Sequence, residues 1–279
     1  MPRQSGIVWL ASYPKSGNTW VRLFLAALTQ VPDLETMAGT PRGATAVAML
    51  QQALDISFQD LSAAETETLR PLAYRHLATR NSGPPLPLKV HDRYRMTPAG
   101  EPLFPPDASR GCLHLVRDPR DLCLSLAAHY AVTVDRAIAM MAEPDYTPAS
   151  SSGTATGLVP ERWGSWSEHT QSWLDAPMDR LMLRYEDLHA DPLGSFTAMA
   201  RYCGLEDLSG RVEEAIGRTR FDQLAAQEKA RGFLERPAAL PTFFRVGQAG
   251  QWHKALSPAQ QSRIERDHGP LMLRLGYLR

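Results

Sequence analysis

The stretch "WLASYPKSGNTWVRLFLAAL" (residues 9–28) decides the fold expected for this chain. Residues 6–12 are a compact apolar run with β-branched and aromatic members, which is typical of a buried strand in a parallel sheet. From Asn18 onward, apolar side chains recur at the spacing of an amphipathic helix. The loop at this strand-to-helix transition therefore holds Lys15, Ser16 and Gly17.

The strand signal recurs three times further along the chain, at residues 85–92, 112–116 and 179–188. Helices are expected from Pro119 to about Tyr130, after the Asp191-Pro192 pair, over residues 162–177 beside the sheet, and from Ser257-Pro258. Strands that alternate with helices predict an α/β protein, a three-layer P-loop-like fold with a central parallel β-sheet flanked by helices.

The composition is that of an ordinary globular protein. Of 279 residues, 43% are hydrophobic, and 30 basic residues balance 30 acidic ones, which argues against a broad nucleic-acid surface. No change in composition divides the chain, so we expect one domain over residues 1–279. Residues 141–160, rich in Ser, Thr, Gly and Pro, are expected to form a mobile loop.

The three cysteines, Cys112, Cys123 and Cys203, form no CxxC pair, and we expect free thiols in a reducing compartment. No window approaches the roughly 20 apolar residues of a membrane span. The amino-terminal apolar run is too short for the core of a signal peptide. A cytoplasmic protein without a membrane span is the expectation.

The loop after the first strand has the composition of an anion site. At a helix start, unpaired backbone N–H groups and the helix dipole favour a negative charge. Lys15 adds a full positive charge, Ser16 and Thr19 offer hydroxyl groups, and Gly17 allows close backbone approach. The order differs from the GxxxxGK[ST] phosphate loop, because the lysine precedes the glycine. A phosphate cradle of another kind is predicted.

"YPKSGNTW" (residues 13–20) resembles the 5′-phosphosulfate loop of the cytosolic-type sulfotransferases, commonly YPKSGTTW. This family binds 3′-phosphoadenosine 5′-phosphosulfate (PAPS) and releases 3′-phosphoadenosine 5′-phosphate (PAP). The single departure is Asn18, which offers its backbone N–H as well as its side chain. The resemblance implies that the loop, Lys15 to Thr19, binds the donor.

Three further segments resemble the family in the same order, so that the resemblance covers nearly the whole chain. "LHLVRDPRDLCLSLAAHY" would bring Arg117 and Ser125 to the 3′-phosphate, and "LMLRYEDLHADP" would bring Tyr185 to the adenine side. "FFRVGQAGQW" resembles RKGxxGDW and would place Arg245 and the backbone around Gly247 on the 3′-phosphate. In that segment Val246 replaces a lysine and Gln251 an aspartate, so 3′-phosphate affinity is expected to be lower.

The same resemblance assigns the adenine site. Trp20 would stack on the base opposite Phe221, with Thr219 near the adenine amino group. Taken singly, each of these matches has a structural alternative: a capping pair at Arg117-Asp118, a strand aromatic at Tyr185, a solvated charge at Arg245. Their joint order favours the functional interpretation.

Sulfuryl transfer needs a base for the acceptor hydroxyl and a positive charge for the departing phosphate. His91 alone among the eight histidines follows a predicted buried strand, at the edge where parallel sheets place their sites. "LKVHDR" also resembles the catalytic-histidine segment of the family. Lys15 would stabilise the leaving group, and the resemblance lets Ser125 engage Lys15 before the acceptor binds. Lys89 would help to orient the base or the acceptor.

The sequence contains no motif that indicates another class of functional site. The histidines show no HxxxH or HExxH spacing, so no metal site is expected, and GxSxG and GxGxxG are lacking. A P-loop phosphotransferase acting on a nucleotide or a small alcohol is the alternative enzyme, and a nucleotide-binding module without activity is the alternative outside enzymes.

The acceptor is expected to be a small molecule with a hydroxyl group, among them a phenol, a sugar, a lipid or a natural product. Residues 37–58, those after His91 and those around Ser150 are candidates for its pocket. The Ala- and Arg-rich composition hints at a bacterial enzyme of specialised metabolism. The oligomeric state stays open, because a helix start at Ser257-Pro258 occupies the place of the family's dimerisation segment.

Overall fold

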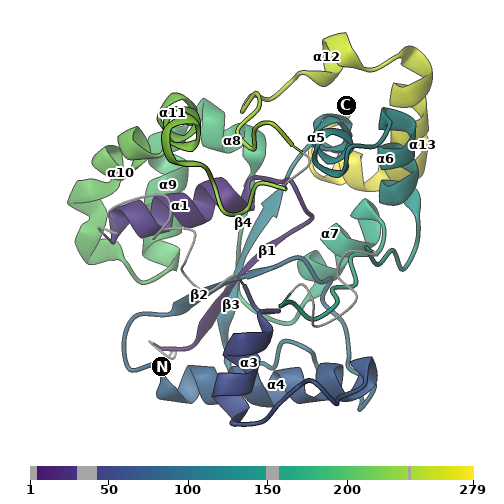
Figure 1. Cartoon of the computed structure of the whole chain (residues 1–279). Helices are drawn as coiled ribbons and strands as arrows, with labels where there is room; N and C mark the ends of the chain where they lie inside the picture. The colour runs from purple at the N-terminus through teal and green to yellow at the C-terminus, as the bar shows by residue number, and fades with distance from the viewer. Residues whose placement is uncertain (1–4, 30–42, 149–156, 238–239) are drawn as a thin grey trace.

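The computed structural model describes residues 5–29, 43–148, 157–237 and 240–279. Four strands among these residues form one parallel sheet in the order β2-β1-β3-β4. The strands are β2 (Leu86–Val90), β1 (Ile7–Ser12), β3 (Ser109–Val116) and β4 (Arg180–Arg184). Ala11 of β1 lies opposite Val90 of β2, and Ser12 lies opposite Leu115 of β3. The carboxyl ends of β1, β2 and β3 therefore meet at one edge of the sheet (Figure 1).

Helices surround the sheet (Figure 1). They are α1 (Asn18–Leu28), α3 (Val47–Leu54), α4 (Ala63–Arg80), α5 (Pro119–Tyr130), α6 (Val134–Ala142), α7 (Trp166–Asp175), α8 (Tyr185–Ala190), α9 (Pro192–Tyr202), the 3₁₀ helix η3 (Glu206–Arg211), α10 (Val212–Arg218), α11 (Phe221–Arg231), α12 (Trp252–Ala255) and α13 (Pro258–Arg274). The α/β class with a parallel central sheet, predicted from the alternation of strands and helices, is confirmed.

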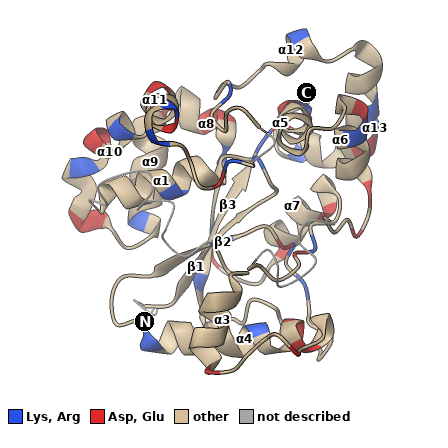
Figure 2. Cartoon of the chain, viewed as in Figure 1, with Lys and Arg blue, Asp and Glu red and all other residues tan. Residues whose placement is uncertain are grey.

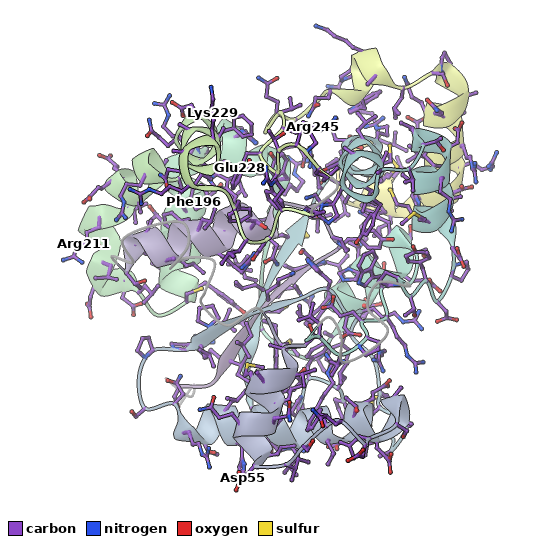
Figure 3. All side chains as sticks on the ribbon, viewed as in Figure 1. Asp55, Phe196, Arg211, Glu228, Lys229 and Arg245 are labelled. Atoms are coloured by element: carbon purple, nitrogen blue, oxygen red, sulfur yellow. The ribbon has the colours of Figure 1, made fainter. Side chains whose placement is uncertain are left out.

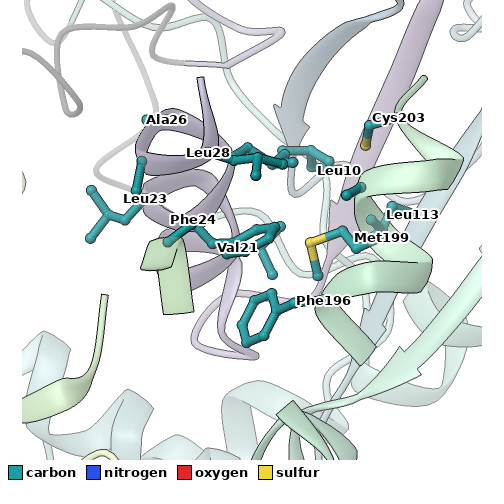
Figure 4. Packing of buried hydrophobic residues seen from close by; sticks show 14 of the residues in the cluster. Leu10, Val21, Leu23, Phe24, Ala26, Leu28, Leu113, Phe196, Met199 and Cys203 are labelled. Carbon is teal, nitrogen blue, oxygen red and sulfur yellow. The ribbon is translucent and has the colours of Figure 1, made fainter. Parts of the chain in front are cut away.

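Both faces of the sheet are buried, as the apolar run in β1 predicts. Side chains alternate across a strand, so Val8 and Leu10 face one layer while Ile7 and Trp9 face the other. Val8 and Leu10 pack with apolar residues of α1, α9 and α10. Figure 4 shows part of this core, with Leu10 of β1, Phe24 of α1 and Phe196 of α9 labelled. Ile7 and Trp9 pack against α3 and α4. The central strand is therefore fixed by two separate cores.

A third core joins α5, α6 and α13. The predicted caps are present: the Asp118 carboxylate accepts the Arg120 N–H at 2.9 Å, and Pro119 is the first residue of α5. Ser257 and Gln260 form a capping box at the start of α13. The helix predicted over residues 162–177 is α7, which begins only at Trp166, behind a capping box at Ser165.

Two predictions of local structure need correction. The strand predicted over residues 179–188 ends at Arg184, and Tyr185 begins the short helix α8. Glu186 and Asp187 lie in the first turn of α8, where carboxylates are favoured, and Asp187 pairs with Arg184 at 2.7 Å. The loop predicted over residues 141–160 begins after α6, which includes Met141 and Ala142. Residues 149–156 lie outside the described residues.

The remaining general features concern cysteines, charge and membrane helices. The three cysteines are free and buried, as expected. Basic positions, blue, and acidic positions, red, are interspersed along the ribbon of the outer helices in Figure 2. Within the described ranges, no single helix has the length and apolarity for a membrane crossing. The pair α5 and α6 passes that test only together, bent by 114°.

Candidate functional site

The loop between β1 and α1 lies at the carboxyl edge of the sheet. Gly17 caps α1 with a φ of +102°, and a Cβ there would lie 2.8 Å from the Tyr185 ring, so only glycine fits. The hydroxyl of Ser16 is buried and has no hydrogen-bond partner among the described residues. The free N–H groups of the first turn of α1 point toward this loop. The backbone geometry is that of an anion cradle.

Lys15 is held firmly in this loop. Its backbone has a φ of +73°, an unusual conformation for a residue with a Cβ, and its carbonyl accepts a hydrogen bond from Arg117 at 3.0 Å. Its ammonium nitrogen lies 4.3 Å from the centre of the Phe243 ring and 3.4 Å from Nδ1 of His129. Burial, and then the charges of Arg117 and Lys89, lower the pKa of Lys15 to about 8.

A cavity of about 690 Å³ opens in front of this loop. Most of the predicted donor-binding residues line it: Lys15, Gly17, Asn18, Thr19, Trp20, Arg117, Ser125, Tyr185, Thr219, Phe221, Arg245 and Gly247. Ser16 lies behind the loop surface, and His91 and Lys89 are not among the lining residues. The structure thus brings together residues from five segments that are far apart in the sequence.

Arg117, at the end of β3, connects three sides of the cavity. One guanidinium nitrogen donates to the carbonyl of Lys15 and another to the carbonyl of Gln248, at 3.3 Å. The guanidinium also lies 4.2 Å from the centre of the Tyr185 ring. Its Nε is buried without a partner among the described residues. Arg117 is therefore both a structural connector and a positive charge in the cavity.

Residues of the segment after α11 line another part of the cavity. Arg245, labelled in Figure 3, donates to the carbonyl of Leu124 at 3.4 Å, so its charge reaches α5 beside Ser125. Asp121 of α5 accepts the N–H groups of Gly250 and Trp252 and fixes the end of the segment. The departures from the family pattern, Val246 and Gln251, both line the cavity. Val246 adds no charge there.

The opposite end of the cavity is aromatic. Trp20 of α1 and Phe221 of α11 line it from two different helices, as expected for residues that flank a base. Thr219, at the end of α10, is fully buried, and its hydroxyl donates to the carbonyl of Ala215 at 2.8 Å. The Thr219 oxygen keeps its acceptor capacity and has no hydrogen left to donate.

Two loop side chains are already engaged within the protein. Asn18 turns inward, and its amide donates to the carbonyl of Leu10 at 2.8 Å and to the Ser12 hydroxyl at 3.1 Å. The side chain expected to face a ligand thus anchors the helix to β1, and only the backbone N–H of Asn18 is left for an anion. The Thr19 hydroxyl donates to Glu235 at 3.4 Å.

His91 follows β2 directly and lies beside Ser12 at the end of β1. Its Nδ1 is 2.8 Å from the carbonyl oxygen of Ser12, so Nδ1 carries the proton and Nε2 has the free lone pair. Burial, followed by the charge of Lys89, lowers the pKa of His91 well below its ordinary value. His91 as a whole residue is 9% exposed. His91 is therefore a neutral imidazole whose tautomer is that of a proton acceptor at Nε2.

Several elements hold His91 in place. Glu161 accepts the backbone N–H of His91 at 3.0 Å. The next residue, Asp92, is fully buried and forms an ion pair with Arg70 of α4 at 2.7 Å. Trp173 of α7 donates to the carbonyl of Asp92 at 2.9 Å. Through Trp173, α7 supports this strand end. No residue of α7 lines the donor cavity.

The acceptor-pocket candidates are only partly visible. Residues 37–42 and 149–156 lie outside the described residues. The described remainder of the first candidate segment contains α3, whose Leu50 and Ala53 are buried in the core.

Two site residues were not predicted. His129 contacts Lys15, and the contact with Ser125 expected from the resemblance is not among the hydrogen bonds of the described residues. The sequence could have indicated His129 as a site residue, because it is four residues after Ser125 on the same helical face. Glu235 binds both Arg22, at 2.7 Å, and Thr19, and places a carboxylate next to the loop. Nothing in its irregular sequence context indicated this.

The unpartnered polar atoms test whether an anionic nucleotide fits the cavity. Ser16 Oγ, Trp20 Nε1 and Arg117 Nε are buried donors without a partner among the described residues. Such donors are costly unless a ligand or water satisfies them. Trp20 and Arg117 line the cavity together with Lys15 and Arg245, and make this lining rich in donors and positively charged. The residues present therefore fit a ligand with phosphate or sulfate groups at one end and an aromatic base at the other. No group of three His, Cys, Asp or Glu side chains with the arrangement of a metal site occurs among the described residues.

Comparisons with known proteins agree with this geometry. A family model described as "Sulfotransferase domain" matches residues 6–276. Sulfotransferase 1A1 of Bos taurus is 24% identical over 270 residues, which cover 94% of this chain and 82% of the relative. Flavonol 3-sulfotransferase of Flaveria bidentis is 23% identical over 279 residues and covers 93% and 79%.

Solved structures share the fold. Mouse sulfotransferase SULT7A1, complexed with PAP, matches with a TM-score of 0.59 at 18% identity, over 96% of this chain and 84% of that one. A retinol dehydratase in complex with androsterone and the inactive cofactor PAP matches with a TM-score of 0.60 at 18% identity, over 95% and 80%.

Proposed function

Because the chain belongs to the sulfotransferase domain family, we propose that it transfers a sulfuryl group from PAPS to a hydroxyl group of a small-molecule acceptor. One observation carries the proposal: Lys15, at the positive end of α1, shares a cavity with Arg117, Ser125 and Arg245. PAPS, when bound, supplies the activated sulfuryl group. The residues of the chain bind it, orient the reactants and handle the proton and the charge.

Lys15 stabilises the leaving phosphate. Negative charge develops there as the bond to sulfur breaks, and a compact ammonium fixed in place beforehand costs no reorganisation at that moment. The Arg117 hydrogen bond to the Lys15 carbonyl, the Phe243 ring and the strained backbone together fix it. The N–H groups of Gly17, Asn18 and Thr19 bind the same end of the donor. Ser16 adds its hydroxyl.

The other end of the donor is bound by the rest of the lining. Arg117, Ser125, Arg245 and the backbone at Gly247 bind the 3′-phosphate. Trp20 and Phe221 enclose the adenine, with Tyr185 and Thr219 at its edge. Since Val246 adds no charge, Arg117 and Arg245 carry the 3′-phosphate site.

His91 acts as the general base. The Ser12 carbonyl holds its Nδ1 proton, so that Nε2 takes the proton of the acceptor hydroxyl as the oxygen attacks. Glu161, Asp92 and Trp173 orient the strand end that carries His91. The buried charge of Lys89 lowers the pKa of both Lys15 and His91. Lys89 helps to orient the base or the acceptor.

The whole chain acts as a single domain. A location in a reducing compartment such as the cytoplasm is supported by the three free, buried cysteines.

Turnover with ³⁵S-labelled PAPS tests the function. Purified protein is incubated in EDTA with a panel of phenols, steroid alcohols, sugars and flavonols, and labelled products are separated. We expect acceptor-dependent transfer that EDTA does not affect. Transfer from ATP that requires Mg²⁺ would instead support the phosphotransferase, and tight PAP binding without any transfer would support an inactive binding module.

Gly247 offers a test of the donor site. Its φ is +61°, and an added Cβ would lie 2.0 Å from the Phe221 ring. Gly247→Ala is therefore expected to displace Phe221 and weaken PAP binding by roughly tenfold or more, since backbone strain and a lost ring contact add. Calorimetric titration with PAP measures this. Gly210→Ala, where an added Cβ meets nothing within 4 Å, is the matched control. Equal PAP affinity in the two variants would contradict the assignment of Gly247 and Phe221.

The pH dependence follows from the two shifted groups. Lys15 must be protonated to act, so kcat/KM for PAPS is expected to fall as the pH rises through the Lys15 pKa of about 8. His91 must be neutral, so the acid limb is expected well below the ordinary histidine range, because burial and Lys89 lower its pKa. A pH profile of initial rates measures both limbs. An acid limb at the pKa of an ordinary histidine would contradict the assignment of His91. A value of kcat/KM that stays constant up to pH 10 would contradict the assignment of Lys15.

A further inference from the structure

His129 lines the cavity from the last turn of α5. Its Nδ1 lies 3.4 Å from the ammonium nitrogen of Lys15. Its ring meets Tyr130 edge to face, with centroids 4.9 Å apart, and Phe243 at 6.3 Å. Phe243 also lies under the Lys15 ammonium, at 4.3 Å. His129 and Phe243 therefore both contact the ammonium group of Lys15.

The chemistry of the pair fixes the direction of the hydrogen bond. An ammonium has only donors, so Lys15 donates and Nδ1 of His129 accepts, and the ring proton sits on Nε2. Such an acceptor must be a neutral imidazole. Burial, and then the charges of Lys15 and Lys89, lower the pKa of His129 to about 4, which agrees with a neutral ring.

The other charged groups around Lys15 do not offer this contact. Arg117, Lys89 and Arg245 are cations that disfavour its charged form. Glu235, from the segment after α11, favours it but is held by Arg22 and Thr19. Among the described residues, His129 is the side chain that accepts a hydrogen bond from the ammonium.

We propose that His129 is a positioning residue for Lys15, which accepts a hydrogen bond from the ammonium and so keeps it protonated and directed into the cavity. The importance of His129 for catalysis rests on the proposed sulfuryl transfer. Its hydrogen bond with Lys15 does not depend on that function. His129 acts through Lys15 and needs no role as a base, because its accepting nitrogen is already occupied by the ammonium.

The proposal is tested by the titration of Lys15 in the free protein. The chain contains only four lysines, at positions 15, 89, 229 and 254. With ¹³C-labelled lysine, the Cε resonances can be followed by NMR across the neutral and alkaline range, and Lys15→Arg identifies the signal. A neutral acceptor is worth about 1 kcal/mol, which corresponds to roughly one pKa unit. We therefore expect His129→Phe to lower the pKa of Lys15 by roughly one unit.

Two further variants complete the design. His129→Asn is expected to retain most of the wild-type value, because the Asn Oδ1 takes the place of Nδ1 as an acceptor. His76→Phe, which removes a histidine of α4 that contacts the Ala53 carbonyl, is the matched control and should change nothing at Lys15. If His129→Phe does not fold, as circular dichroism would show, His129→Ala replaces it with the same expected shift.

An unchanged or raised pKa of Lys15 in His129→Phe or His129→Ala would overturn the proposal. So would an equal fall in His129→Asn and His129→Phe, since the effect would then come from packing. This outcome is separate from the proposed function: the protein could fail to use PAPS and still show the shift, or use PAPS and show none.

Discussion

Replacement of Lys15 by alanine is expected to reduce kcat for sulfuryl transfer by roughly 10²–10³-fold, the usual loss when one preorganised charge-stabilising donor is removed. The ammonium contacts His129 and Phe243, and Arg117 fixes the Lys15 backbone through its carbonyl, so alanine removes a charge that the protein holds in a defined position. Affinity for PAP should fall much less, because Arg117, Arg245 and the helix N–H groups remain. Single-turnover rates with labelled PAPS measure the first effect and calorimetry the second.

The controls for Lys15 are other cations. Lys229→Ala removes an exposed lysine of α11, labelled in Figure 3, that does not line the cavity, and should leave kcat unchanged. Lys15→Arg keeps the charge with a different shape and should restore only part of the rate. If Lys15→Ala turned over PAPS at a rate close to that of the wild type, Lys15 would have no part in leaving-group stabilisation.

Replacement of His91 by alanine is expected to reduce kcat by roughly 10²–10⁴-fold, the range for removal of a general base. The loss should be confined to the chemical step, because His91 does not line the donor cavity. PAP affinity should therefore match that of the wild type. The acid limb of the pH profile should also disappear in the variant, since the group that titrates there is gone.

His253→Ala is the matched control for His91. His253 is exposed on α12, stacked on Trp252, and its removal should leave the rate unchanged. A His91→Ala variant with near-normal transfer would show that the base lies elsewhere. If His129→Ala lost the rate instead, without a shift at Lys15, the roles of the two histidines would have to be exchanged.

The parts of the fold that the sequence predicts are those with local signals. β1 is a continuous apolar run between a glycine and a Tyr-Pro pair, and α5 carries a capping aspartate and a proline at its start. The loop at Lys15 is recognisable because strand, lysine, glycine and helix follow one another without a gap. Each of these signals lies within a few residues of the feature that it predicts.

The corrected or missed features depend on contacts between distant segments. Asn18 looks like a ligand donor in the sequence, yet the Leu10 carbonyl lies within reach of its amide once α1 packs on β1. Tyr185 was expected in a strand, because nothing before Glu186 marks the end of β4. Glu235 reaches Arg22 across 213 residues of chain. Such pairs follow from topology and not from local pattern.

The two histidines illustrate the same limit. His91 could be predicted because it follows a buried strand at the functional edge of a parallel sheet. His129 is on an ordinary helix, and its contact with Lys15 spans 114 residues. Its spacing of four residues from Ser125 places it on the same helical face, but the contact with Lys15 itself is seen only in the three-dimensional arrangement.

Calorimetric titration of the wild-type protein with PAP, ADP and ATP, each with EDTA and with Mg²⁺, tests the central claim most directly: that the Lys15 loop and the two arginines form a metal-independent site for a 3′-phosphorylated donor. The account predicts one PAP bound per chain, more tightly than ADP, which lacks the 3′-phosphate, and with no effect of EDTA. ATP bound more tightly than PAP, and only with Mg²⁺, would contradict it.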